Sequence, residues 1–469
     1  MTQTLRQNLN DKAWARWTAM VMIALMMLFA HMFVDVISPL KELIQIQRGW
    51  TSDVFGTYAG SEYLLNVWGF LIVAGIILDK MGIRFTGELS AIMMLIGACI
   101  KYYAVSEAFI GTGLEAWLNS WWVAMPASAK LASFGFMIFG CGCEMAGITA
   151  SKALAKWFEG KEMALAMGLE MALARVGVFF IFTISPRIAG IGGADPSIVR
   201  PVAFCSALLM IGLLCFTVFC VMDKKLDAQR GAITEGESDE EFKLSDIGKI
   251  FSSRLFWIVA MLCVLYYSAI FPFQKFAANM LQSNLGISAT AASDIFRWFP
   301  IGAACITPLL GWYLDRKGKG ATMLILGSLL MIVCHSTFAL VLPVFPSKVL
   351  AFSAIILLGI SFSLVPAALW PSIPKIMDKR YLGSAYSLIF WVQNFGLSGT
   401  PFIIGYALEK TNPGVAEQIA AGVEGVAYNY TVPMLLFASL GVLALIFALW
   451  LKADDKRNGY GLELPNIKE

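Results

Sequence analysis

The sequence has few charged residues and almost no histidine. Only 14% of its 469 residues are Asp, Glu, Lys or Arg, and two are histidine. Soluble proteins carry roughly 25% charged residues, so a soluble enzyme and a disordered chain are both excluded. The net charge of +3 is too small and too dispersed to indicate a nucleic-acid partner. No nucleophile–base pair or metal-ligand cluster appears, so we predict no enzymatic activity, no cofactor and no metal site.

The loops contain no cysteine. All nine cysteines fall within apolar runs, which excludes a secreted disulfide scaffold. The segment from Cys141 to Cys143 reads Cys-Gly-Cys, and we interpret it as small residues that allow close helix packing.

Long apolar runs dominate the chain, which is 58% hydrophobic. A membrane-spanning helix needs about 20 apolar residues. The chain contains twelve such runs, at 17–38, 53–78, 85–105, 130–151, 162–184, 198–222, 255–280, 291–314, 321–342, 348–370, 382–406 and 432–452. We therefore predict an all-α membrane protein embedded in a lipid bilayer, with 12 transmembrane helices in two pseudo-symmetric six-helix bundles. Its predicted parts are an N-terminal bundle (1–222), a cytoplasmic linker (223–254), a C-terminal bundle (255–452) and a cytoplasmic tail (453–469).

Basic residues set the expected orientation. With the N-terminus placed in the cytoplasm, about two thirds of the 35 Lys and Arg residues fall in inner segments. We expect both ends of the chain in the cytoplasm.

One motif occurs twice, half a chain length apart. The second and eighth runs both end in G-x-x-x-D-[KR]-x-G-x-[RK] at an inner turn. We expect the first glycine of each copy to let helices approach, the second to allow a tight reversal with positive φ, and the charges to cross-link inner helix ends. The motif residues are Gly75, Asp79, Lys80, Gly82 and Arg84 in the first copy, and Gly311, Asp315, Arg316, Gly318 and Lys319 in the second.

The duplicated turn resembles the signature loop of the major facilitator superfamily. That resemblance covers nearly the whole chain. It implies two six-helix bundles around a central site, alternating access by rocking, and the motif as a latch on the inner face.

Three further segments resemble the lysosomal dipeptide transporter group of this superfamily. They are residues 157–177 at the start of the fifth run, 266–273 in the seventh, and 369–396 around the tenth and eleventh. The resemblance implies uniport of dipeptides. The N-terminal segment lacks an acidic dileucine sorting signal, so we expect a bacterial inner membrane rather than a lysosome.

Charged side chains within the apolar runs are expensive and therefore candidates for function. Two of them, Glu144 and Arg175, lie near mid-membrane, about 12 Å and 20 Å from their inner helix ends at ~1.5 Å per residue. An extended dipeptide spans about 7 Å at ~3.5 Å per residue, so Glu144 could hold its ammonium group and Arg175 its carboxylate. The resemblance to the dipeptide transporter group implies the same roles, because a Glu and an Arg at matching positions are assigned there to the two peptide ends. The alternative is a permanent Glu144–Arg175 ion pair.

The remaining candidates are assigned to gates, to packing or to further substrate contacts. We expect Asp35, Lys275 and Arg297 to pair at an outer gate. Glu62 is either a satisfied buried carboxyl group or a proton site, and Glu170 has an inner-gate or packing role. Polar and aromatic residues that could also contact the substrate are Tyr267, Trp370, Gln393 and Asn394.

These features predict a monomeric secondary transporter of small solutes, with dipeptides as the expected substrate and any accessory subunit unknown. No ATP-binding motif is present, and coupling stays open because Glu62, Glu144 and Glu170 could each titrate. One alternative is an organic-anion carrier that binds a dicarboxylate with Arg175 and either Arg297 or Lys275. A second is a non-transporting sensor on the same fold.

Overall fold

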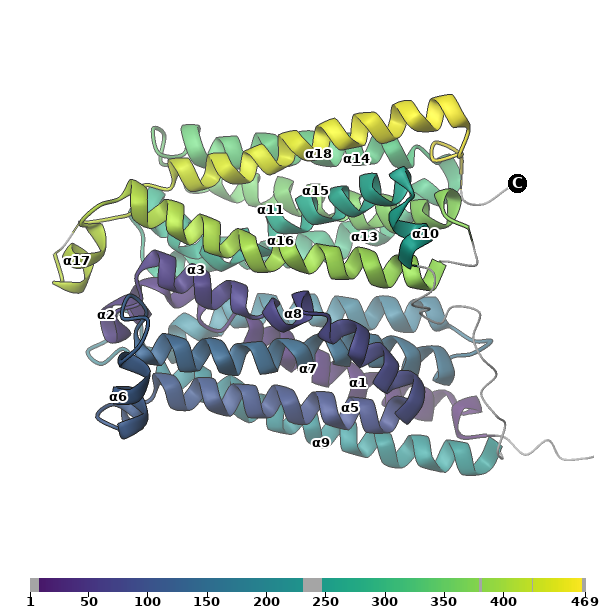
Figure 1. Cartoon of the computed structure of the whole chain (residues 1–469), viewed down its shortest axis with the longest axis horizontal. Helices are drawn as coiled ribbons and strands as arrows, with labels where there is room; N and C mark the ends of the chain where they lie inside the picture. Colours follow the sequence, from purple (N-terminus) through teal and green to yellow (C-terminus); the bar gives the residue numbers. More distant parts are fainter. Residues whose placement is uncertain (1–7, 231–246, 379–381, 424, 466–469) are drawn as a thin grey trace, which may run out of the picture.

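A computed structural model describes residues 8–230, 247–378, 382–423 and 425–465. The described residues contain helices and no strand. The helices form two bundles that lie side by side, one from the first half of the chain and one from the second (Figure 1). The N bundle contains α1 (Ala13–Val34), α3 (Ser52–Ser61), α4 (Leu64–Val67), α5 (Phe70–Val105), α7 (Ala127–Trp157), α8 (Met163–Ile188) and α9 (Val199–Arg230). The C bundle contains α11 (Arg254–Leu285), α12 (Ala289–Phe296), α13 (Trp298–Lys317), α14 (Gly320–Ser336), α15 (Lys348–Ile376), α16 (Leu382–Thr411) and α18 (Thr431–Asn458).

These helices form the twelve predicted membrane spans. Ten helical segments of the described chain are long and apolar enough to cross a membrane on their own. The second span is assembled from α3, α4 and the first part of α5, and α16 is the eleventh. Short elements cap the ends: η1 (Leu9–Asp11), η2 (Ser38–Leu40), α2 (Lys41–Arg48), η3 (Glu107–Phe109), α6 (Gly113–Asn119), α10 (Ile247–Phe251), η5 (Thr337–Val341) and α17 (Val415–Ala420).

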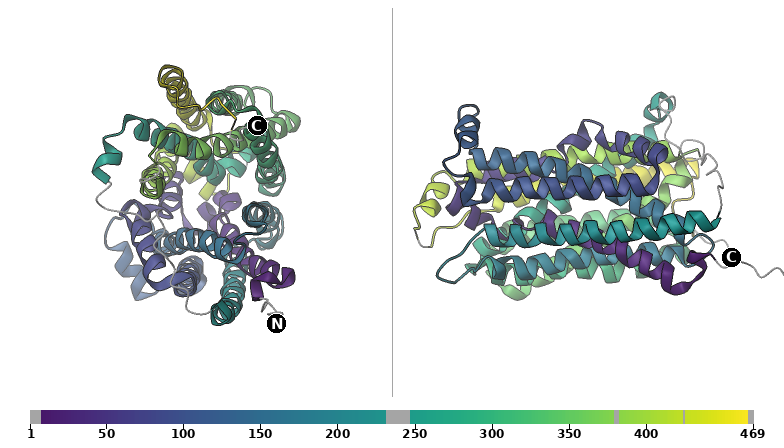
Figure 2. Two further views of the ribbon diagram at one scale, coloured as in Figure 1. Left: turned by 90° about the vertical axis from the view of Figure 1, so that its right-hand side faces the viewer. Right: turned by 90° about the horizontal axis from the view of Figure 1, so that it is seen from below.

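The two ends of the molecule differ in what they carry. Helices α6 and α17 lie at one end, and the C-terminal end of the chain lies at the other (Figure 2). Below, the end with the chain termini is called the inner face and the opposite end the outer face.

The second span is broken rather than continuous as the apolar run 53–78 suggests. The helix is interrupted at Glu62–Tyr63 and again at Trp68–Gly69, where Gly69 has a φ of 92°. The backbone carbonyls next to the breaks face α16: the Ser398 hydroxyl donates to the Gly60 carbonyl at 3.0 Å, and the Trp391 indole donates to the Val67 carbonyl at 2.8 Å. The breaks therefore join the two bundles through main-chain groups.

The predicted glycine reversals are confirmed. Gly82 has a φ of 77° and a ψ of 175° and separates the second span from the third within α5. Gly318 has a φ of 70° and ends α13. Only glycine adopts such conformations without strain, which is why a repeated glycine in an inner turn was informative.

The bundles meet closely on the outer side. Helices α3 and α16 touch backbone to backbone, since a Cβ atom on Gly56 would lie 2.3 Å from the Pro401 carbonyl oxygen, and one on Gly405 would lie 2.3 Å from that of Ser52. Hydrogen bonds and ion pairs also join the bundles in the outer half: Gln45 donates to the Ala416 carbonyl at 3.2 Å, and the Ser52 amide donates to Glu409 at 2.9 Å. This conformation is therefore closed toward the outer face.

Two predicted boundaries need correction. Helix α9 continues to Arg230, so the first part of the predicted linker 223–254 is helical; residues 231–246 lie outside the described part. Helix α18 continues to Asn458, and residues 459–465, called the C-terminal tail below, fold back onto the C bundle. In both cases polar side chains beyond the apolar run find partners on neighbouring helices.

Candidate substrate site and gates

Glu144 and Arg175 come from adjacent spans of the N bundle. Glu144 lies on α7 and Arg175 on α8, and both side chains are half-buried. Within the described part of the chain, the structure gives neither residue a hydrogen bond or an ion pair. Arg175 instead stacks on Phe362 of α15, with 4.8 Å between its guanidinium carbon and the ring centre. The alternative of a permanent Glu144–Arg175 ion pair is not realised in this conformation.

Small residues hold the helix of Glu144 against its neighbours. A Cβ atom on Gly140 would lie 1.8 Å from the Glu62 carbonyl oxygen, and one on Gly142 would lie 2.7 Å from that of Ser90. The interpretation of the Cys-Gly-Cys segment as a close-packing sequence is thus confirmed. This packing fixes the backbone from which Glu144 projects.

An aromatic group of the C bundle lies opposite Arg175. The Trp370 indole donates to the Tyr267 hydroxyl at 3.1 Å and stacks on Phe390 at 4.8 Å between ring centres. Tyr267 also packs edge-on against Phe362, the ring that carries Arg175. Tyr267 and Trp370 therefore belong to the same contact network as Arg175.

Gln393 and Asn394 are both buried in α16. The Gln393 side-chain oxygen accepts a hydrogen bond from the Cys263 thiol at 3.1 Å, which engages it with α11. Asn394 donates to the Phe390 carbonyl of its own helix at 2.8 Å. Their predicted contact with substrate stays a prediction.

A buried cluster of three charges joins the bundles on the outer side. The Lys275 ammonium of α11 lies 3.3 Å from the Asp35 carboxylate and 3.1 Å from that of Glu62. Lys275 also donates to the Val34 carbonyl at 3.0 Å, and Asp35 accepts hydrogen bonds from Ser38 and Gln274. We call Asp35, Glu62 and Lys275 the outer charge cluster. Lys275 is thus the C-bundle partner of two N-bundle carboxylates, a geometry consistent with the outer-gate pairing expected of Asp35 and Lys275.

Arg297 pairs within its own bundle. It lies 2.9 Å from Asp294 and stacks near Phe179 of α8. The same Asp294 also pairs with Arg187 of α8 at 2.8 Å, and this second ion pair crosses between the bundles. Arg187 follows the apolar run and reads as an ordinary outer-loop charge, so no sequence signal identified it. Glu170 is buried in α8, and its gate or packing role stays a prediction.

The sequence reading also misses Lys101 on α5. Its side chain is fully buried, and its ammonium nitrogen has no hydrogen-bond partner. The ammonium instead lies over the rings of Phe33, Phe136 and Tyr58, at 4.2, 4.4 and 5.2 Å from their centres. Near the end of an apolar run, a lysine normally reads as a residue that reaches the membrane surface. Only the three-dimensional arrangement reveals the aromatic enclosure.

The first inner turn is cross-linked by charges, as its motif suggests. Asp79 pairs with Lys152 at 3.0 Å. Arg84 contacts Asp223 and Asp227 of α9, at 3.0 and 2.5 Å, and Lys156 contacts the same two carboxylates. Lys80 is exposed.

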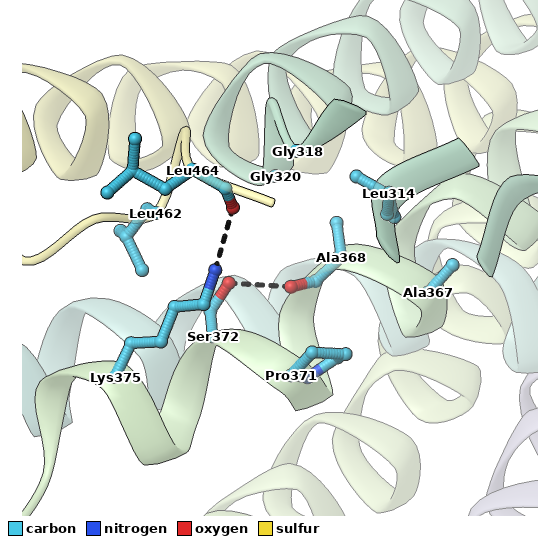
Figure 3. A pocket seen from close by; sticks show the side chains of 10 residues that line it. All are labelled: Leu314, Gly318, Gly320, Ala367, Ala368, Pro371, Ser372, Lys375, Leu462 and Leu464. Carbon is cyan, nitrogen blue, oxygen red and sulfur yellow. Dashed lines mark hydrogen bonds between the residues drawn. The ribbon is translucent and has the colours of Figure 1, made fainter. Parts of the chain in front are cut away.

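The second inner turn is closed by the C-terminal tail instead. The Lys375 ammonium donates to the Gly461 and Leu464 carbonyls, at 3.1 and 3.0 Å, beside a small pocket between the tail and the ends of α13 and α15 (Figure 3). The Lys319 amide donates to the Glu463 carbonyl at 3.0 Å, and the Glu463 carboxylate accepts from the Thr322 amide at 2.8 Å. The sequence alone gave no sign of this contact.

The other residues of the second copy behave differently from one another. Asp315 has an interaction partner, and Arg316 stacks on Trp312 at 4.8 Å. The expectation that Gly75 and Gly311 allow close helix approach is wrong here, since a Cβ atom at either position would meet nothing within 4 Å. No described helix packs tightly against these two positions in a conformation whose close contacts lie on the outer side.

The fold and these sites agree with a family model. The model described as Major Facilitator Superfamily matches residues 23–401 and again residues 275–465. The chain belongs to this superfamily and is a multi-pass integral membrane transporter.

The chain is also similar to named proteins within that class. It is 28% identical over 376 residues to the lysosomal dipeptide transporter MFSD1 of Danio rerio, covering 79% of this chain and 75% of the relative. It is 27% identical over 350 residues to the MFSD1 of Homo sapiens, covering 72% and 68%.

Solved structures share its fold. A bacterial homologue of the lysosomal transporter Spinster, in an inward-facing and occupied conformation, aligns with a TM-score of 0.68 at 14% identity, over 93% of this chain and 97% of its own. A D-xylose–proton symporter aligns with a TM-score of 0.66 at 14% identity, over 92% and 97%.

Proposed function

We propose that this transporter moves dipeptides across the membrane by alternating access, with Glu144 holding the peptide ammonium group and Arg175 the carboxylate. One observation carries the proposal: these two opposite charges have no ion pair within the described chain, whereas Asp35, Glu62 and Lys275 pair with one another. A charge at membrane depth without a protein partner is costly. A zwitterionic ligand would supply both missing partners at once.

The surroundings of the two charges support a ligand with two charged ends and variable side chains. Arg175 can form a bidentate contact with a carboxylate, which Lys could not. Its stacking on Phe362 presents the guanidinium edge for such a contact. Tyr267 and Trp370 offer aromatic surface that accepts apolar or polar peptide side chains, in line with the dipeptide transport named for the relatives.

Ligand-induced thermal stabilisation tests the proposal. The purified protein would be melted with dipeptides, single amino acids, tripeptides and dicarboxylates, and each hit repeated on Glu144→Gln and Arg175→Ala. A ligand at 100 times its Kd adds about 2.7 kcal/mol to the stability of the folded state. We expect dipeptides alone to stabilise the protein and both variants to lose the effect.

Glu170→Gln is the matched control, because it neutralises another buried glutamate of the N bundle that the proposal leaves without substrate contact. It should keep the dipeptide response. Stabilisation by dicarboxylates that survives Glu144→Gln would overturn the proposal in favour of an anion carrier.

The contacts of the other cations count against that anion carrier. It needs Arg297 or Lys275 as a second cation, and both are occupied: Arg297 pairs with Asp294, and Lys275 with Asp35 and Glu62. The sensor alternative is tested by flux in proteoliposomes. Binding of dipeptides without uptake would favour it.

We further propose that both chain ends face the cytoplasm, as the distribution of Lys and Arg indicates. The bacterial inner membrane, the monomeric state and uniport remain predictions from the sequence. Uptake with and without a proton gradient tests the last of these.

A further inference from the structure

The outer charge cluster poses a problem for any cycle that opens the outer face. Asp35 and Glu62 belong to the N bundle, whereas Lys275 belongs to the C bundle. Separating the bundles on the outer side withdraws Lys275 and leaves two carboxylates on the N bundle without their cation. Leaving one partner of a buried ion pair unmatched is strongly unfavourable.

A second buried lysine lies beside this cluster. Lys101 and Lys275 contact the same ring, Phe136, with their ammonium nitrogens 4.4 and 5.4 Å from its centre. Lys101 also lies over Phe33 and Tyr58, which precede Asp35 and Glu62 by two and four residues. Unlike Lys275, it belongs to the N bundle and stays with the two carboxylates when the bundles separate.

We propose that Lys101 is a replacement counter-ion, which leaves its aromatic enclosure to pair with Asp35 and Glu62 when Lys275 withdraws. This inference rests on the proposed alternating-access cycle. In the outer-closed conformation Lys275 occupies the carboxylates, and its positive charge disfavours a second ammonium group beside them. In that conformation, cation–π contacts with Phe33, Phe136 and Tyr58 stabilise the Lys101 ammonium away from the two carboxylates.

The unsatisfied groups around Lys101 fit an exchange of partners. Its ammonium nitrogen has no hydrogen-bond partner, and neither does the hydroxyl of Tyr58, which stacks on Phe136. Buried polar groups are rarely left unpaired, so two unpaired groups side by side need an explanation, and an exchange of partners supplies one. The lysine stem is long and flexible, so a rotamer change can move the ammonium without moving α5.

The test measures outer opening directly, without a substrate. Spin labels on cysteines at Leu114 of α6 and Glu417 of α17 report the separation of the bundles at the outer face, after replacement of the native cysteines. In lipid, the labelled protein with native Lys101 and Glu62 should give two distances between the labels, a short one from the outer-closed form and a long one from the outer-open form. We expect Lys101→Met to lower the ratio of long to short at least tenfold, and the added Glu62→Gln, which removes one carboxylate, to restore it.

Controls separate this role from general packing. Lys130→Met removes another buried outer-side lysine that is bound within its own bundle, to the Leu118 carbonyl at 2.5 Å, and should leave the ratio unchanged. Lys101→Met removes a buried charge that has no hydrogen bond and keeps an apolar side chain against the three rings, so the melting temperature should not fall. Lys101→Gln serves if the methionine variant does not fold.

Three outcomes would overturn the proposal. The ratio could be unchanged in Lys101→Met, it could fall without recovery in the double variant, or it could fall equally in Lys130→Met. A single short distance in the labelled protein with native Lys101 and Glu62 would overturn the alternating-access cycle itself and this inference with it. Because no ligand is needed, a failure of dipeptide binding leaves the result interpretable.

Discussion

The two inner turns carry the same motif but are held by different partners. In the N bundle, Arg84 and Lys156 bind the carboxylates of Asp223 and Asp227 on α9. In the C bundle, Lys375 of α15 binds two backbone carbonyls of the C-terminal tail. One turn is closed by ion pairs with a helix, and the other by main-chain hydrogen bonds with a tail.

The difference shows that a repeated sequence motif specifies a turn but not the contacts that hold the turn in place. We call those contacts its lock. Gly82 and Gly318 both have a positive φ, which glycine adopts without the strain that a side chain brings. The lock depends on which polar groups of the same bundle lie next to the turn, on α9 in one case and on the C-terminal tail in the other. The N-bundle lock centres on the buried Asp223 carboxylate, so we expect it to contribute more stability than the C-bundle lock.

The largest effect should come from Asp223→Asn. The Asp223 side chain is 1% exposed and accepts from Arg84, Lys156 and the Trp157 indole. Removing its charge leaves Arg84 and Lys156 with Asp227 alone of these two carboxylates. Because Arg84 is 42% exposed, we expect a loss of about 3 kcal/mol, the low end for buried pairs. Denaturant unfolding in micelles would measure it. Asp227→Asn is the control, because that carboxylate is 41% exposed and should cost clearly less. Equal losses would refute the ranking.

Gly318→Ala should be the next most damaging change. A Cβ there would lie 2.4 Å from the Glu463 carbonyl oxygen, so the tail must move, and φ is +70°. We expect a loss of about 2–4 kcal/mol from strain and lost hydrogen bonds. Gly82→Ala meets no atom within 4 Å and should cost only the strain, about 1–3 kcal/mol. In a chain that lacks the tail, the two substitutions should converge; a persistent excess for Gly318→Ala would count against tail displacement as the cause.

Deleting the chain from residue 459 onward sharpens the comparison. It removes the acceptors of Lys375 and of the Lys319 and Gly320 amides. The cost should be about 1–2 kcal/mol, since water can replace these bonds at the inner face. Hydrogen exchange should accelerate at the start of α14 and stay unchanged around Arg84. Faster exchange in both bundles would mean that the two locks are coupled.

Glu463→Gln should have the smallest effect. It keeps the tail and its main-chain bonds but weakens the acceptor for the Thr322 amide and hydroxyl. We expect about 0.5–1 kcal/mol, the difference between a charged and a neutral hydrogen bond. A loss as large as that of the tail deletion would show that the carboxylate, and not the main chain, holds the tail.

Much of the fold follows from local sequence. The twelve spans are visible as apolar runs, and the reversals at Gly82 and Gly318 follow from glycine in a repeated pattern. The breaks in the second span were not predicted, since Tyr63 and Trp68 lie within the apolar run 53–78. Main-chain partners on α16 stabilise those breaks, and a distant helix leaves no local signal.

The candidate site likewise has a part that the sequence predicts and a part that depends on how the helices pack. Glu144 and Arg175 are conspicuous because charges are rare in apolar runs, and the pairing of Asp35 with Lys275 was expected from their shared depth. That Lys275 also binds Glu62, and that Lys101 lies among three rings, depends on how separate helices pack. The tail contact with Lys375 is likewise a tertiary result.

The backbone contact between α3 and α16 offers a means of trapping the transporter. Gly56 and Gly405 lie so close to the facing main chain that a single methyl group on either has no space. A side chain there acts as a wedge and excludes the outer-closed form without touching any charge or substrate group. One alanine could thus supply the opposite conformer for structure determination, leaving the binding residues as they are in the native chain.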